Sequence, residues 1–195
     1  MKSVALEGYW QVGKTTALRW LENERGYTTI GEPDHALIPE KPQTDMLDDW
    51  YWVAHYHNLL TFLQNPHHVV MERTAASTLA FMESMHPQDR GVLKKIDAFL
   101  DSEEATKWKE LELVVLLSVE ISDYLARITQ IESESLRTFL LGNTEFLHRY
   151  IDNLVKYIEL LTGGESLKQI AVFENGIFRS CATIQKEIIS TLKGI

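Results

Sequence analysis

The chain has 195 residues, 45% of them hydrophobic, with a formal net charge of −9 at pH 7. This length is usual for one α/β domain with one core, so we expect a single domain over residues 1–195. The acidic balance argues against a partner that is a nucleic acid polymer or a membrane, because such binders need excess lysine and arginine. The sequence has no signal peptide or long apolar run, and its only cysteine is Cys181, so we expect a soluble, cytoplasmic protein without an internal disulfide.

Short apolar runs alternate with longer segments of helical period along the chain. The runs are rich in Val and Leu, as strands buried on both faces are, and they cover residues 4–7, 27–31, 68–72, 113–117 and 169–173. The helical segments cover residues 14–24, 48–64, 75–85, 89–102, 122–130, 144–161 and 180–192. A crossover of helix length between successive strands predicts an α/β fold, with a five-stranded parallel sheet and helices on both faces.

The first expected strand is followed directly by the motif Gly8-x-x-x-x-Gly13-Lys14-Thr15. This is the P-loop pattern, whose backbone N–H groups form an anion nest at the positive end of a helix. Lys14 would contact the β- and γ-phosphates of ATP, and the Thr15 hydroxyl would bind Mg²⁺. The motif predicts a three-layer fold of the P-loop NTPase type, although a glycine-rich turn without a ligand is the alternative. The predicted cofactor-binding residues are Gly8, Tyr9, Trp10, Gln11, Val12, Gly13, Lys14, Thr15 and Thr16.

Two acidic residues stand at the ends of apolar runs. Glu32 follows the second run, and Glu72 ends the third and is followed by Arg73. Because the carboxyl ends of parallel strands lie at one edge, we expect both carboxylates near the P-loop. Phosphoryl transfer to a hydroxyl needs an orienting carboxylate or base, an acidic partner for Mg²⁺ and a cation, which these three residues can supply. The alternatives are a polar start to a proline turn for Glu32, and a surface ion pair for the other two.

Four stretches together resemble the thymidylate kinases and the related deoxyribonucleoside kinases, over residues 2–162. They are VALEGYWQVGKTT (4–16), GEP (31–33), MERTAASTLAF (71–81) and LLSVEISDYLARI (116–128). The resemblance implies an ATP- and Mg²⁺-dependent phosphotransferase that moves a γ-phosphoryl group to a nucleoside or a similar small hydroxyl acceptor. It places Glu32 near the acceptor hydroxyl, Glu72 near the metal and Arg73 near the acceptor oxygen. A homodimer is possible, as in related kinases.

The segment at about residues 127–143 takes the place of the lid with which these kinases close several arginines over the phosphates. Arg127 matches the first of these arginines and is the catalytic candidate of this segment. Ile131 and Ser133 stand where further arginines are expected, unless an arginine farther along folds back. An arginine clamp contributes about 10³ to 10⁵ in rate, so this departure leaves open a non-catalytic nucleotide-binding or regulatory protein.

The helix expected over residues 48–64 has an aromatic face. Trp52, His55 and Tyr56 share it at helical spacing, and could bind the base of an acceptor, with core packing as the alternative. Thymidylate kinases carry an arginine on this helix that holds the monophosphate, whereas residues 43–71 contain neither Arg nor Lys. This favours a nucleoside acceptor, with a nucleoside monophosphate kinase as the alternative.

Overall fold

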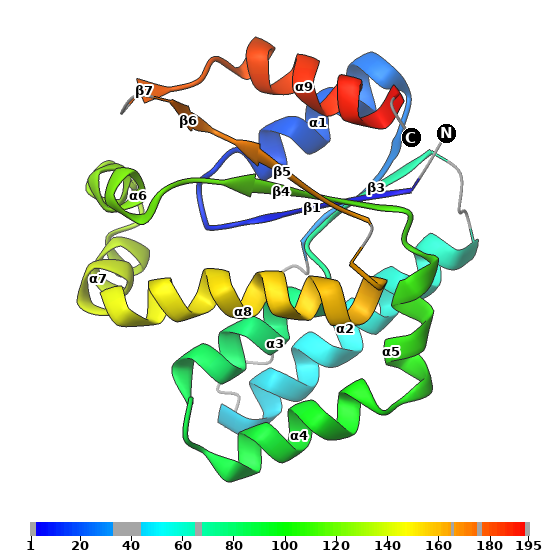
Figure 1. Ribbon diagram of the computed structural model, residues 1–195, viewed down its shortest axis with the longest axis vertical. Helices are drawn as coiled ribbons and strands as arrows, with labels where there is room; N and C mark the ends of the chain where they lie inside the picture. The colour runs from blue at the N-terminus through cyan, green and yellow to red at the C-terminus, as the bar shows by residue number, and fades with distance from the viewer. Residues whose placement is uncertain (1–2, 33–43, 65–67, 165, 175–176, 194–195) are drawn as a thin grey trace.

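The computed structural model describes residues 3–32, 44–64, 68–164, 166–174 and 177–193, and of residues 44–53 it describes the backbone alone. A five-stranded sheet forms the middle layer, with the strand order β2-β3-β1-β4-β5 (Figure 1). All neighbouring strands pair in parallel, which confirms the predicted sheet. The strands are β1 (Val4–Gly8), β2 (Thr28–Ile30), β3 (Val69–Glu72), β4 (Leu113–Ser118) and β5 (Leu167–Ala171).

Helices cover both faces of this sheet, as Figure 1 shows, and the three-layer prediction is therefore confirmed. One face carries α1 (Lys14–Arg25) and α9 (Cys181–Lys193). The other face carries α2 (Thr44–Gln64), α3 (Ala75–Met85) and α8 (Thr144–Thr162), with α4 (Arg90–Leu100), α5 (Glu103–Lys107) and the 3₁₀ helix η2 (Trp108–Glu110). Beyond the end of β4 lie α6 (Ile121–Ile128) and α7 (Glu134–Gly142).

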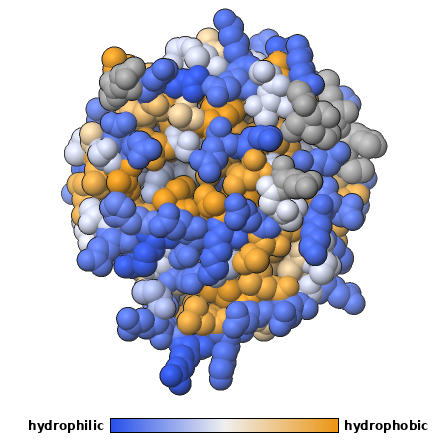
Figure 2. Space-filling model, viewed as in Figure 1, coloured by the Kyte–Doolittle hydropathy of each residue, from blue (hydrophilic) through white to orange (hydrophobic). Residues whose placement is uncertain are grey.

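The central strands β3, β1 and β4 are buried almost throughout, because helices shield both of their faces. The edge strands β2 and β5 each bury one isoleucine, Ile30 and Ile170. The outward face of α8 is hydrophilic and forms a band across the view in Figure 2. Apolar side chains lie above and below this band. Glu7 is an exception in the core, because it is an acidic residue that is fully buried in β1.

Several boundaries differ from the sequence-based prediction, for local reasons. The helix expected over residues 89–102 ends at Leu100, since the Ser102 hydroxyl accepts from the Ala105 amide and starts a new helix, α5. The expected lid segment contains the helix α7, which begins where the Ser133 hydroxyl accepts from the Leu136 amide. Both α5 and α7 begin at serine caps and are too short to show a clear hydrophobic period, so the sequence pattern did not predict them.

The end of the chain also differs from the expected pattern. The strand expected over residues 169–173 is β5, which begins and ends two residues earlier. Beyond it, β6 (Phe173–Glu174) and β7 (Ile177–Phe178) form an antiparallel hairpin that leads into α9. In the part of the chain that the structure describes, no helix is both long and apolar enough to span a membrane.

Candidate active site

The P-loop joins β1 to α1 through backbone conformations that favour glycine. Gly8 has φ 138°, and a Cβ atom there would lie 2.5 Å from the carbonyl oxygen of Leu117 in β4. Gly13 has φ 97°, and Gln11 adopts the left-handed region at φ 60°. Only glycine therefore lets β1 pass so close to β4 before the chain turns toward α1.

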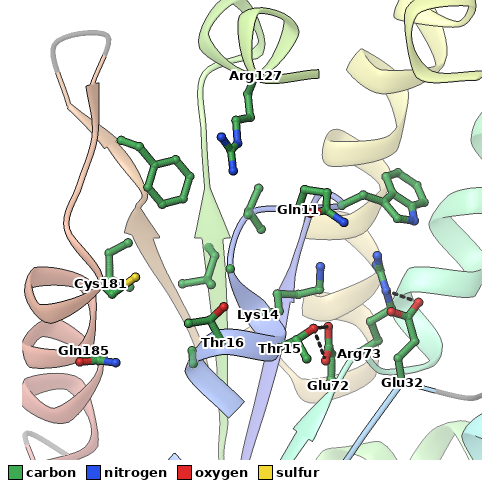
Figure 3. Close-up of a pocket in the computed structure, with 17 residues that line it drawn as sticks. Gln11, Lys14, Thr15, Thr16, Glu32, Glu72, Arg73, Arg127, Cys181 and Gln185 are labelled. Atoms are coloured by element: carbon green, nitrogen blue, oxygen red, sulfur yellow. Dashed lines mark hydrogen bonds and ion pairs between the residues drawn. The ribbon is translucent and has the colours of Figure 1, made fainter. Parts of the chain in front are cut away.

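A cavity of about 560 Å³ lies over the P-loop (Figure 3). It brings together the loop residues 10–16 with four predicted site residues, Glu32, Glu72, Arg73 and Arg127. Gly8 and Tyr9 belong to the loop but do not line this cavity. Its far side is formed by Phe178 and by three residues that the sequence analysis missed, which are Cys181, Ile184 and Gln185.

Lys14 lies at the floor of the cavity and is 4% exposed. Its ammonium group donates to the carbonyl oxygen of Tyr9 at 2.7 Å and to that of Gly8 at 3.5 Å. Burial, and secondarily the positive charge of Arg73, lower the pKa of Lys14 to about 7, against the opposing effect of nearby carboxylates. An anion in the cavity would counter both effects and favour the charged lysine.

Thr15 and Glu72 are in direct contact. The Thr15 hydroxyl lies 3.0 Å from each of the two carboxylate oxygens of Glu72. Hydroxyl and carboxylate oxygens are ligands that Mg²⁺ accepts, and Mg²⁺ is commonly held by one or two carboxylates together with substrate phosphates. Among the described residues, no cluster of three or more acidic, His or Cys side chains offers another metal site. The predicted pair therefore fits Mg²⁺ in the presence of a nucleotide.

Arg73 and Glu32 form an ion pair at the wall of the cavity. The distance between Arg73 Nε and Glu32 Oε1 is 2.7 Å, and the Glu32 side chain is 31% exposed whereas that of Arg73 is 5% exposed. Arg73 Nη1 also donates to the hydroxyls of Tyr150 at 3.0 Å and Ser77 at 3.2 Å. Burial disfavours its charge, but Tyr150, Glu32 and other partners raise the pKa of Arg73 above its usual range. The guanidinium is thus charged and fixed, while Glu32 has access to the cavity.

Glu7 is a further element of this site that the sequence analysis missed. Its carboxylate accepts hydrogen bonds from the amide of Thr74 at 2.6 Å, from the hydroxyl of Thr74 at 2.7 Å and from that of Ser77 at 2.6 Å. Burial raises the pKa of Glu7, against the effects of Arg73 and of these hydrogen bonds. The signal in the sequence is an acidic residue inside an apolar strand. Glu7 ties β1 to the start of α3 directly behind Arg73.

We expect the substitution Glu7→Ala to lower the free energy of unfolding by about 3–5 kcal/mol, because it leaves the buried donors of Thr74 and Ser77 without their acceptor and removes a negative charge near Arg73. Urea unfolding measures this loss. Glu145→Ala is the matched control, since Glu145 is 91% exposed and pairs with Arg149 at 3.5 Å, and we expect a change below about 1 kcal/mol. Equal effects of the two substitutions would contradict the structural role of Glu7.

Arg127 is the arginine of α6 that lines the cavity. Its guanidinium lies 5.4 Å from the ring centroid of Phe178 in β7, and Nη1 donates to Gln130 Oε1 at 2.8 Å. Two arginines farther along the chain do not line the cavity. Arg137 donates to the carbonyl oxygen of Ile131, and Arg149 donates to a carbonyl of α3. The cations that line the cavity among the described residues are therefore Lys14, Arg73 and Arg127.

Two of the predicted acceptor-binding residues of α2, His55 and Tyr56, do not line the P-loop cavity. His55 and Tyr56 line a second cavity of about 240 Å³, together with residues of α3, α4, α5 and η2. Burial, and secondarily the charge of Arg73, lower the pKa of His55 to about 3, so its imidazole is neutral. The side chain of Trp52 lies outside the described part of the structure. The role of these three residues in binding an acceptor stays a prediction.

No protein-family model matches this sequence, and no curated protein matches it. Solved structures, however, resemble it over nearly their whole length. A deoxyadenosine kinase from M. mycoides with the products dCMP and dCDP has a TM-score of 0.73 at 17% identity, covering 99% of this chain and 100% of that chain. A thymidylate kinase from Candida albicans has a TM-score of 0.62 at 12% identity, covering 99% of this chain and 91% of that chain. The chain therefore has the fold of the deoxynucleoside and thymidylate kinases.

Proposed function

We propose that this protein is a kinase that transfers the γ-phosphoryl group of ATP to a nucleoside or a similar small hydroxyl compound, with Mg²⁺. The observation that carries the proposal is the convergence, in one cavity, of three separate parts of phosphoryl-transfer machinery. These are the P-loop with its buried Lys14, the contact of Thr15 with Glu72, and the ion pair of Arg73 with Glu32. The likeness in fold to known kinases supports the same assignment.

Each part has a role in the proposed reaction. The loop amides and Lys14 bind the β- and γ-phosphates, and Thr15 and Glu72 hold the metal. When bound, Mg²⁺ neutralises charge on these phosphates. Glu32 orients the acceptor hydroxyl and accepts its proton, because its carboxylate is partly exposed at the cavity wall. Arg73, which is fixed beside Glu32, stabilises charge near the acceptor oxygen.

The base of the nucleotide would lie at the end of the cavity that is farthest from Glu32. Figure 3 shows Cys181 and Gln185 of α9 on the side of the cavity opposite Glu32, and Arg127 above the P-loop. The Arg127 guanidinium lies 5.4 Å from the ring centroid of Phe178, which also lines the cavity. A planar guanidinium and an aromatic ring are both suited to stack on a base. We therefore propose that Arg127 contacts the nucleotide near its base. This contact does not require that Arg127 also acts in phosphoryl transfer.

We expect uncharged nucleosides to be better acceptors than their 5′-monophosphates. A monophosphate carries nearly two negative charges, whose burial without cations would cost several kcal/mol. Among the described residues, the cation at the proposed acceptor end is Arg73, and it is already paired with Glu32 and close to Glu7. ADP formation from ATP and Mg²⁺ across a panel of nucleosides and monophosphates tests this preference. Faster turnover of a monophosphate would favour the nucleoside monophosphate kinase instead.

A non-catalytic nucleotide-binding or regulatory protein is the second candidate function. It is favoured by the shortage of arginines over the cavity, because Arg127 lines the cavity whereas Arg137 of the lid and Arg149 of α8 donate to carbonyl oxygens elsewhere. The same panel separates the two candidates when it is combined with calorimetric titration of ADP. Binding of ADP without turnover of any acceptor would support the second candidate, and turnover would remove it.

A further inference from the structure

We propose that Tyr124 is a positioning residue that holds the P-loop in its phosphate-binding conformation and ties it to the helix that carries Arg127. The proposal rests on the proposed function, because it concerns how the same cavity binds a nucleotide. Tyr124 does not line this cavity and is fully buried in α6. It would act through the loop and through Arg127 rather than by touching the nucleotide.

The first half of the P-loop is clamped between two helices by aromatic side chains. The ring of Tyr124 stacks on that of Tyr9, with 4.2 Å between ring centroids and 13° between ring planes. The Tyr124 hydroxyl donates to the carbonyl oxygen of Trp10 at 3.1 Å. On the other side, the Tyr9 hydroxyl donates to the carbonyl oxygen of Leu147 in α8 at 2.8 Å. The loop is therefore anchored to α6 and to α8 at adjacent residues.

The hydrogen bond from Tyr124 restrains one particular peptide unit. In a trans peptide, the carbonyl of Trp10 and the N–H of Gln11 point in opposite directions. Because the carbonyl is directed at the buried Tyr124, the N–H of Gln11 is directed away from it. Gln11 lines the cavity, and an anion nest needs its amides on that side. The hydroxyl thus holds a candidate phosphate donor in its binding orientation.

This restraint is needed because Gln11 has an unfavourable backbone conformation. Its φ of 60° lies in the left-handed region, which non-glycine residues rarely adopt without support from their surroundings. Lys14 supports the preceding peptide by donating to the carbonyl oxygen of Tyr9. A bound phosphate would compete for that lysine, whereas the contact with Tyr124 lies outside the cavity and can persist.

The same tyrosine sets the position of Arg127. The two residues are three positions apart on α6, so they lie on neighbouring parts of one helix surface. Anchoring Tyr124 to the P-loop therefore fixes the start of the lid at a constant distance from the phosphate site. Arg127 extends from this fixed helix toward Phe178.

The variant Tyr124→Phe tests the proposal, because it keeps the ring that stacks on Tyr9 and removes the hydroxyl. We expect the Kd for Mg-ADP, and the Kd for inorganic pyrophosphate, to rise about tenfold in calorimetric titration. In the kinase assay, the KM for ATP should rise while the KM for the acceptor changes little. Deuterium exchange of residues 9–13 should be faster than in the wild type.

Tyr157→Phe is the matched control, since Tyr157 is a buried tyrosine of α8 whose hydroxyl donates to Glu83 at 2.6 Å, away from the cavity. It loses a hydroxyl of the same kind and should keep wild-type affinity for both ligands. Unchanged affinity and unchanged exchange in Tyr124→Phe would overturn the proposal, as would equal losses in both variants. If the wild type itself does not bind Mg-ADP, the proposed function fails first and this proposal falls with it.

Discussion

The substitution Lys14→Ala is expected to weaken ATP binding by at least about 100-fold and to abolish turnover. The ammonium group is the cation at the floor of the P-loop cavity, and charge-assisted hydrogen bonds to phosphates are worth about 3 kcal/mol. Calorimetric titration of the variant with Mg-ADP and with a non-hydrolysable analogue of ATP measures the loss of affinity directly.

The fold should survive this change. Lys14 is buried and its pKa is lowered mainly by burial, so its removal relieves a cost of desolvation. Lys109→Ala, at an exposed lysine of η2, is the control and should bind as the wild type does. A folded Lys14→Ala protein with normal affinity and activity would refute the phosphate-binding role of the loop.

The substitution Glu32→Gln is expected to lower turnover by at least about 100-fold while the Kd for ATP changes little. Glutamine keeps an oxygen that can accept from Arg73 Nε, but it cannot accept a proton from the acceptor hydroxyl. Steady-state kinetics with the best acceptor of the panel provides the measurement, and the variant's affinity for Mg-ADP provides the internal control. If turnover survives, Glu32 is a residue of the turn, and Glu72 becomes the leading candidate for the carboxylate in catalysis.

The secondary structure could be predicted largely because it depends on local patterns. Strands buried on both faces are continuous apolar runs, and the long helix α8 has enough turns for its hydrophobic period to be read. The exceptions are short. The helix α7 begins at a serine cap, and β6 and β7 have two residues each, so neither element shows a clear hydrophobic period and both were missed.

Part of the site could also be predicted from sequence order alone. The P-loop is a contiguous motif, and Glu32, Glu72 and Arg73 follow parallel strands whose carboxyl ends meet at one edge. In a parallel sheet these residues and the P-loop must lie at the same edge, and the three residues line one cavity there with residues 10–16 of the loop. The separation of His55 from this cavity could not be foreseen, because helical periodicity identifies a face of α2 but not what that face packs against.

The sequence by itself determined the alternation of strands and helices, the P-loop and the set of charged residues at the ends of strands, because each depends on neighbours along the chain. Only the tertiary structure decided which distant side chains support them. Glu7 meets Thr74 across 67 positions and Tyr124 meets Trp10 across 114, and no local pattern encodes such pairs. They arise because β1 lies between β3 and β4, so that the segments that follow these two strands close around the P-loop from both sides.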